Sequence, residues 1–121
     1  MKNWSYILIT LMALGCTEFL SPDVSERRLT INSPKDSLVT AKNEIIFWWE
    51  EDEDAEFYQI QVVSPGFDHP EFILDTQILD NQLRMESLLD TTYDWRLRIK
   101  NEATQSIWQQ RHFEIDSTYD E

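Results

Sequence analysis

The feature that most constrains the fold of this chain is a strict alternation of apolar and polar residues at positions 93–100 (YDWRLRIK). Alternate side chains of an extended strand point to opposite faces. A period of two therefore predicts a strand with one face in a core and the other in solvent. The predicted inward side chains are Tyr93, Trp95, Leu97 and Ile99.

Short alternating runs of this kind recur between turn signals along residues 29–116, and no window shows a helical stripe. About seven short strands without a helix predict an antiparallel β-sandwich. We expect Trp49, Tyr58 and Ile60 to meet Trp95 in the middle of its core. The expected strands are residues 29–31, 44–50, 55–63, 72–75 with an exit at 77–79, 82–87, 93–100 and 107–115, with a short pairing piece at Leu38 and Val39.

The N-terminus has the features of an export signal. Lys2 precedes an apolar segment at residues 6–14 (YILITLMAL), which is too short to span a bilayer and ends at Gly15 and Cys16. This arrangement resembles a bacterial lipoprotein signal, which is cut before the cysteine. The resemblance implies a signal peptide at residues 1–15 and acyl chains such as palmitate on Cys16, which is the lipid attachment point.

That resemblance also implies a membrane location through the lipid anchor. The cell envelope is expected, in particular the outer membrane, with the domain facing the periplasm or the cell surface. A simple secretory signal and a cytosolic protein with an apolar N-terminus remain as alternatives. Residues 16–28 are rich in Ser, Pro, Asp and Glu, which predicts a tether. Residues 29–116 are predicted to form a single domain, and residues 117–121 an acidic tail.

Charge and cysteine content exclude several classes of protein. Acidic residues outnumber basic ones 23 to 10, for a formal net charge of -13 at pH 7. So negative a surface repels phosphate backbones, and we expect no nucleic-acid partner. Cys16 is the only cysteine, so there is neither an intrachain disulfide nor a cysteine-based zinc site.

Four motifs appear in order along the predicted domain. The first is an aromatic residue followed two positions later by Trp, at residues 47–49 (FWW). The others are AEFYQIQV at 55–62, YDWRLR at 93–98, and a final strand with Trp108 and FEI at 113–115. Together they resemble a bacterial fibronectin type III domain, an immunoglobulin-like fold. The resemblance implies a seven-stranded antiparallel sandwich that acts as an interaction module.

The resemblance further implies that the Tyr93 hydroxyl bonds to backbone a few residues upstream. At this corner the sequence departs from the family pattern. Ser87 stands where the family usually has leucine, and Leu88 and Leu89 are the nearest apolar residues.

No catalytic frame is recognisable. His69 and His112 are the only histidines, and neither has a nucleophile in a known local motif. Gly66 is the only glycine after the signal, so no phosphate-binding loop exists. We expect a non-enzymatic protein without a cofactor.

The acidic run at residues 50–56 offers oxygen ligands that Ca²⁺ prefers, and Asp52 and Asp54 are weak candidates. The run lacks the alternating frame of a calcium loop, so a solvated loop is the alternative. For ligand contact the candidates are Trp108, Phe72 and Trp48, because strand parity or a loop position exposes them, as it also exposes Phe57 and Phe67. The resemblance implies that Trp48 and Phe57 lie in different sheets. Trp108 has a competing interpretation, in which it packs on arginine side chains.

The polar face of residues 93–100 carries the one basic stripe of the chain: Arg96, Arg98 and Lys100. We expect these cations to pair with nearby carboxylates, and the alternative is that they receive an anionic ligand. The sequence thus predicts a membrane-anchored accessory module with a protein partner in the cell envelope. A carbohydrate-binding accessory protein of a glycan-uptake system and a calcium-dependent adhesion module are the alternatives.

Overall fold

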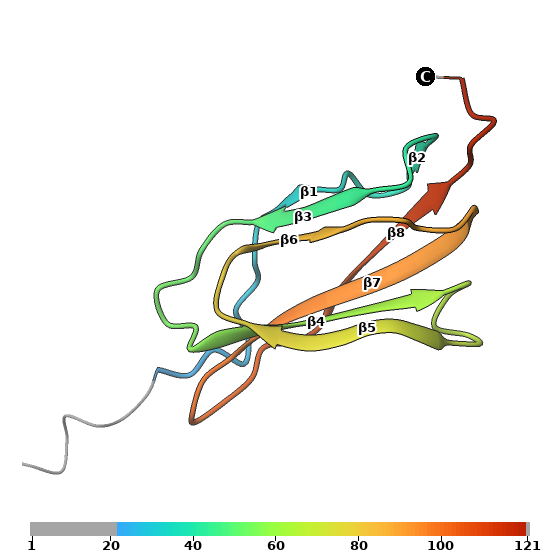
Figure 1. Ribbon diagram of the computed structural model, residues 1–121. Helices are drawn as coiled ribbons and strands as arrows, with labels where there is room; N and C mark the ends of the chain where they lie inside the picture. The colour runs from blue at the N-terminus through green and yellow to red at the C-terminus, as the bar shows by residue number, and fades with distance from the viewer. Residues whose placement is uncertain (1–21, 121) are drawn as a thin grey trace, which may run out of the picture.

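The computed structural model describes residues 22–120 (Figure 1). The predicted signal peptide, Cys16 and residue 121 lie outside the described residues. Within residues 22–120 no helix is long and apolar enough to cross a membrane. The described chain forms eight strands: β1 (Ile31–Ser33), β2 (Leu38–Thr40), β3 (Ile45–Trp49), β4 (Phe57–Ser64), β5 (Glu71–Ile78), β6 (Gln82–Met85), β7 (Thr91–Lys100) and β8 (Gln109–Ile115).

The strands form two sheets, one with the order β1-β3-β6 and one with the order β2-β8-β7-β4-β5. Figure 1 shows the two sheets as stacked layers, so the predicted all-β sandwich is confirmed. β5 lies at an edge of the larger sheet, as expected for residues 72–79. The described chain enters at one end of the sandwich and leaves at the opposite end.

The structure has eight strands where the sequence predicted seven, and the difference lies at β2. Pro34 follows β1 and has no N–H to continue its pairing with β3. The chain then crosses to the larger sheet, where the predicted pairing piece at Leu38 and Val39 runs parallel to β8. The first segment thus contributes a short strand to each sheet.

The core lies between the sheets and is built from alternate residues of the long strands. Phe47 contacts Trp95 edge to face at a centroid distance of 4.7 Å, and Trp49 contacts Tyr58 in the same way at 5.4 Å. Phe113 stacks on Tyr93 at 4.9 Å. The predicted inward faces are confirmed, since the buried cluster contains every inward residue of β3 and β7.

The corner before β7 has the expected tyrosine bond. Tyr93 Oη donates to the Leu89 carbonyl at 2.8 Å, and burial raises the pKa of the Tyr93 hydroxyl. Ser87 has a φ of 57°, in the left-handed region that disfavours large side chains. Leu88 is buried instead, which accounts for the departure of this corner from the family pattern.

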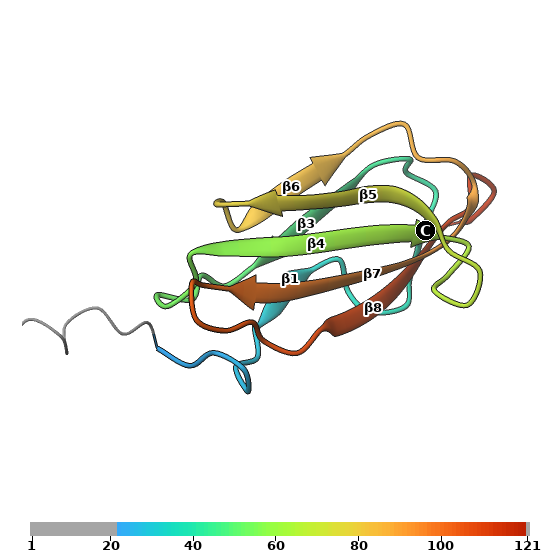
Figure 2. The ribbon, with the colours of Figure 1, turned by 90° about the horizontal axis from the view of Figure 1, so that it is seen from below.

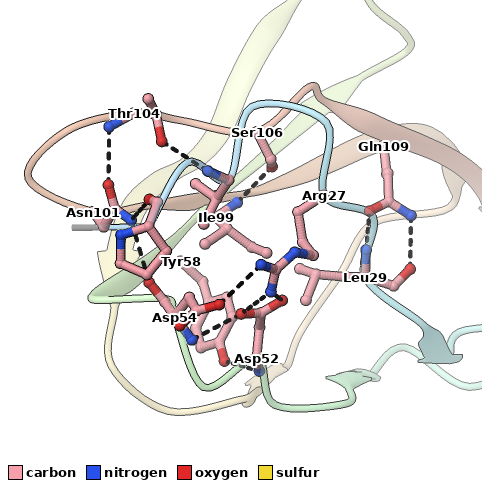
Figure 3. Close-up of polar contacts among 12 residues, drawn as sticks. Arg27, Leu29, Asp52, Asp54, Tyr58, Ile99, Asn101, Thr104, Ser106 and Gln109 are labelled. Atoms are coloured by element: carbon pink, nitrogen blue, oxygen red, sulfur yellow. Dashed lines mark hydrogen bonds and ion pairs between the residues drawn. The ribbon is translucent and has the colours of Figure 1, made fainter. Parts of the chain in front are cut away.

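The packed domain begins earlier than residue 29, because residues 22–29 form a strap across one end of the sandwich (Figure 3). Val24 is fully buried, and its N–H donates to Thr104 Oγ1 at 2.9 Å. Leu29 was expected in the first strand. Its backbone N–H and C=O instead bond to the side-chain amide of Gln109, and β1 begins two residues later.

An ion-pair cluster fastens the same strap to the acidic loop. Arg27 Nη1 lies 2.7 Å from Asp52 Oδ2, and Nη2 lies 2.9 Å from Asp54 Oδ2 (Figure 3). Hydrogen bonds to Asp54 and Asp52 raise the pKa of Arg27. The Tyr58 hydroxyl accepts the Asp52 N–H at 3.0 Å, which joins the loop to β4. Residues 22–28, predicted as the end of a tether, are therefore part of the domain.

Candidate functional site

The candidate site is the outer face of the five-stranded sheet, which faces the viewer in Figure 2. Burial of alternate residues on β7 turns Arg96, Arg98 and Lys100 outward. The antiparallel register places Gln61 beside Arg96 and Gln59 beside Arg98. We call this surface the basic–aromatic face and define it by these residues together with Phe57, Phe67 and Trp108.

Two glutamines of β4 fix the guanidinium groups. Arg96 Nε donates to Gln61 Oε1 at 2.7 Å. Arg98 donates to Gln59 Oε1 from both Nε and Nη2, at 2.9 and 2.7 Å. Amide oxygens on the neighbouring strand therefore hold both arginines flat along the sheet.

Aromatic rings cover the same guanidiniums. Arg96 Cζ lies 4.5 Å from the Phe67 ring centroid and 4.4 Å from that of Trp108, and Arg98 Cζ lies 4.1 Å from Trp108. Lys100 Nζ lies 5.5 Å from the Phe57 ring. All four distances are within the range of cation–π attraction. Trp108 thus packs against both arginines, which was one of its two predicted roles.

The structure does not pair the basic stripe with carboxylates, although the sequence predicted such pairs. Of the ion pairs formed among residues 22–120, none includes Arg96, Arg98 or Lys100. Amide oxygens and aromatic rings stabilise these cations, but they do not cancel their charge. Burial and the nearby Arg96 charge lower the pKa of Arg98, while Asp75 opposes this shift.

A loop after β4 supplies Phe67 and approaches β7 closely. Asp94 Oδ2 accepts the Phe67 N–H at 3.1 Å, and Oδ1 lies 2.8 Å from His112 Nδ1. A Cβ built on Gly66 would stand 2.7 Å from Asp94 Oδ2. Glycine at position 66 therefore lets the loop lie against Asp94 and present Phe67 to Arg96.

Gly66→Ala is expected to destabilise the domain by about 1–3 kcal/mol, because the added methyl group must displace the loop or the Asp94 carboxylate. Chemical denaturation measures this loss. In an Asp94→Ala background the same substitution should cost less, since the clashing group is absent. Equal costs in both backgrounds would show that Asp94 is not the obstacle.

The other predicted contact residues do not share one surface. Trp48 is 45% exposed on β3, in the three-stranded sheet, whereas Phe72 is 52% exposed on the edge strand β5. Trp48 and Phe57 lie in different sheets, as expected. The structure therefore does not bring Trp48, Phe72 and Trp108 together.

Asp52 and Asp54, the weak calcium candidates, are both bound to Arg27. In the part of the chain that the structure describes, no group of three or more His, Cys, Asp or Glu side chains is placed to hold a metal ion. Of the two histidines, His69 is exposed and His112 contacts Asp94.

Sequence reasoning placed Gln59 and Gln61 outward and Phe67 in an exposed loop, but it did not join them to the basic stripe in one face. The two glutamines alternate with the inward residues of β4, which is a usable signal once β4 is known to neighbour β7. Phe67 has no such signal, because it reaches the face from a loop.

No family model and no curated protein matches this chain. Solved structures do match, and they share its fold. FN3tt is 21% identical, with a TM-score of 0.52 over 75% of this chain and 91% of that chain. The fibronectin type III domain of human collagen alpha-1(XX) is 12% identical, with a TM-score of 0.57 over 80% and 94% of the two chains.

A third match, the PKD domain of the human VPS10 domain-containing receptor SorCS2, is also 12% identical. Its TM-score is 0.52, over 86% of this chain and 85% of that chain. At these identities the likeness concerns the fold. Residues 22–120 form a fibronectin type III-like β-sandwich.

Proposed function

We propose that this chain is a lipid-anchored, non-enzymatic accessory module that binds a protein partner at the cell envelope through its basic–aromatic face. The observation that carries the proposal is the composition of that face. In a chain of net charge -13, the three cations of β7 form no ion pair with a carboxylate of the described residues. A basic row kept unpaired amid so many carboxylates favours an anionic partner.

The fold supports a binding role by analogy. One fold can carry many unrelated functions, so function resides in the surface that each domain carries. Here the surface has fixed guanidiniums and stacked aromatics, two residue classes that are enriched at protein interfaces.

The proposed anchor would limit the distance between the domain and the membrane. Six residue steps separate Cys16 from Pro22, a span of at most about 22 Å. Asn101 Nδ2 donates to the Pro22 carbonyl at 2.8 Å, so the strap leaves the domain beside the β7–β8 connection. An acylated Cys16 would hold that end of the domain near the outer membrane, with the domain facing the periplasm or the surrounding medium.

Cys16→Ser is expected to move the protein from the membrane fraction to the soluble fraction, because it removes the acylated thiol and two or more acyl chains are needed for stable anchoring. Fractionation and mass spectrometry of the mature N-terminus measure both effects. Thr17→Ser is the matched control and should stay in the membrane fraction. A mature protein that begins at an unmodified Met1 would contradict the anchor.

The two alternative functions have less support. Glycan binding by ring stacking needs an open aromatic platform, but Trp108 is engaged by Arg96 and Arg98. Calcium-dependent adhesion needs free carboxylates in the acidic loop, but Asp52 and Asp54 are both paired with Arg27.

A further inference from the structure

We infer that the partner presents an extended acidic segment with a carboxylate at every second residue, which lies along β7 over Arg96, Arg98 and Lys100. This inference rests on the proposed function and specifies the chemistry of the partner. Four features of the face support it: the spacing of the cations, their fixed geometry, their remaining hydrogen-bond donors and the screening of the surrounding negative charge.

Spacing is the first. Outward residues of one strand recur about every 7 Å, which is the repeat of Arg96, Arg98 and Lys100 along β7. An extended polypeptide has the same repeat, so carboxylates at alternate residues match the three cations in register. A helix places charges about 5–6 Å apart at four-residue steps and curves away from a flat sheet.

Pre-organisation is the second. Each arginine is already held by a glutamine and by at least one ring. A partner therefore immobilises little further side-chain freedom, which is a main cost of binding. A planar guanidinium held in this way presents its remaining N–H groups as a fixed fork for carboxylate.

The third feature is the set of hydrogen-bond donors that remain on these cations, which favour a carboxylate ligand. Among residues 22–120, Arg96 uses only Nε for a hydrogen bond, so both terminal nitrogens keep their donors for one carboxylate. Arg98 uses Nε and Nη2, and Nη1 is left for a second. Lys100 contributes a point charge beside Phe57.

The strong negative charge of the chain does not prevent such a contact. Screening at physiological salt limits the reach of exposed charges to about 8 Å. Two carboxylates of the same sheet already have protein partners, since Asp94 contacts His112 and Asp75 accepts from Gln59 at 3.4 Å. Glu114 lies opposite Thr92, which is four residues before Arg96 on β7, so this carboxylate lies beyond the row of cations.

Fluorescence anisotropy with the full chain tests the inference. One probe is a labelled octapeptide that alternates Glu and Thr, and a second has the same composition in two blocks. The alternating peptide should bind about tenfold tighter or more, and Arg96→Gln and Arg98→Gln should each weaken its binding about tenfold or more, because a hydrogen-bonded charge pair is lost. Lys42→Gln removes a cation remote from the face and should leave binding unchanged.

Circular dichroism melts verify that each variant is folded, and Arg98→Lys should weaken binding less than Arg98→Gln because it keeps the charge. Equal binding of both peptides, no binding of either, or binding that ignores Arg96 and Arg98 would overturn the inference. Tighter binding of an oligogalacturonate would also overturn it and would assign the face to an acidic glycan.

A photo-crosslinker at Gln110, which is exposed beside Arg96, separates this inference from the proposed function. A protein captured in cells only when Arg96 is present, without any binding of the alternating peptide, would leave the proposed function standing and refute the acidic segment. Absence of both signals would refute both.

Discussion

Replacing Trp95 with alanine is expected to lower the free energy of unfolding by about 3–5 kcal/mol. Trp95 is fully buried, and its ring packs edge to face on Phe47. The substitution removes a large apolar side chain from the centre of the core and leaves a cavity between the sheets. Because domains are stable by only about 5–15 kcal/mol and this chain has a single cysteine, the loss threatens the native state.

Urea denaturation of both variants measures the effect, and Trp48→Ala is its matched control. Trp48 lies on the outer side of β3 and is 45% exposed, so its removal should change stability by about 1 kcal/mol or less. Similar losses at positions 48 and 95 would contradict the assignment of inward and outward faces to β3 and β7.

For β7 that assignment could be read from the sequence because it depends on local periodicity alone, whereas β3 is apolar throughout and its inward face was inferred from the register of the alternating strand that follows. Strict alternation on β7 specifies which side chains enter the core, whatever the neighbouring strands are. The corner bond of Tyr93 was expected from the resemblance to fibronectin type III domains, and its acceptor, Leu89, lies four residues upstream.

Contacts between side chains far apart in sequence were not predictable. Residues 22–28 have no period because they pair with side chains from elsewhere: Arg27 with Asp52 and Asp54, and Val24 with Thr104. An acidic loop and a charged tether each looked solvated when considered separately. Only the fold places the acidic loop beside the charged segment of residues 22–28.

The same limit applies to the candidate site. The sequence identified the basic stripe and offered Arg96 or Arg98 as neighbours of Trp108, since strand parity places all three on polar faces. It favoured carboxylate partners, because acidic residues are so abundant. The strand order instead puts β4 beside β7, and β4 carries glutamine at the facing positions.

Gln109→Ala is expected to destabilise the domain by about 2–4 kcal/mol and to loosen the N-terminal strap. The Gln109 side chain accepts the Leu29 N–H and donates to the Leu29 carbonyl at 2.8 Å (Figure 3). Both residues are buried, so alanine would leave two backbone groups without partners, at about 1–3 kcal/mol each. The Gln109 side chain thus supplies hydrogen-bond partners to the backbone of the strap, as a neighbouring strand does for β1.

Two measurements test this role. Chemical denaturation gives the change in stability, and limited trypsin digestion reports the strap directly, because Arg27 and Arg28 are cleavage sites within it. Gln110→Ala, an exposed glutamine on the same strand, is the matched control and should leave both readings unchanged. If trypsin cuts after Arg28 no faster in Gln109→Ala than in Gln110→Ala, the strap is held by Val24 and Arg27 without the help of Gln109. In that case the end of the domain nearest the proposed anchor is fixed by its ion pairs and its buried valine.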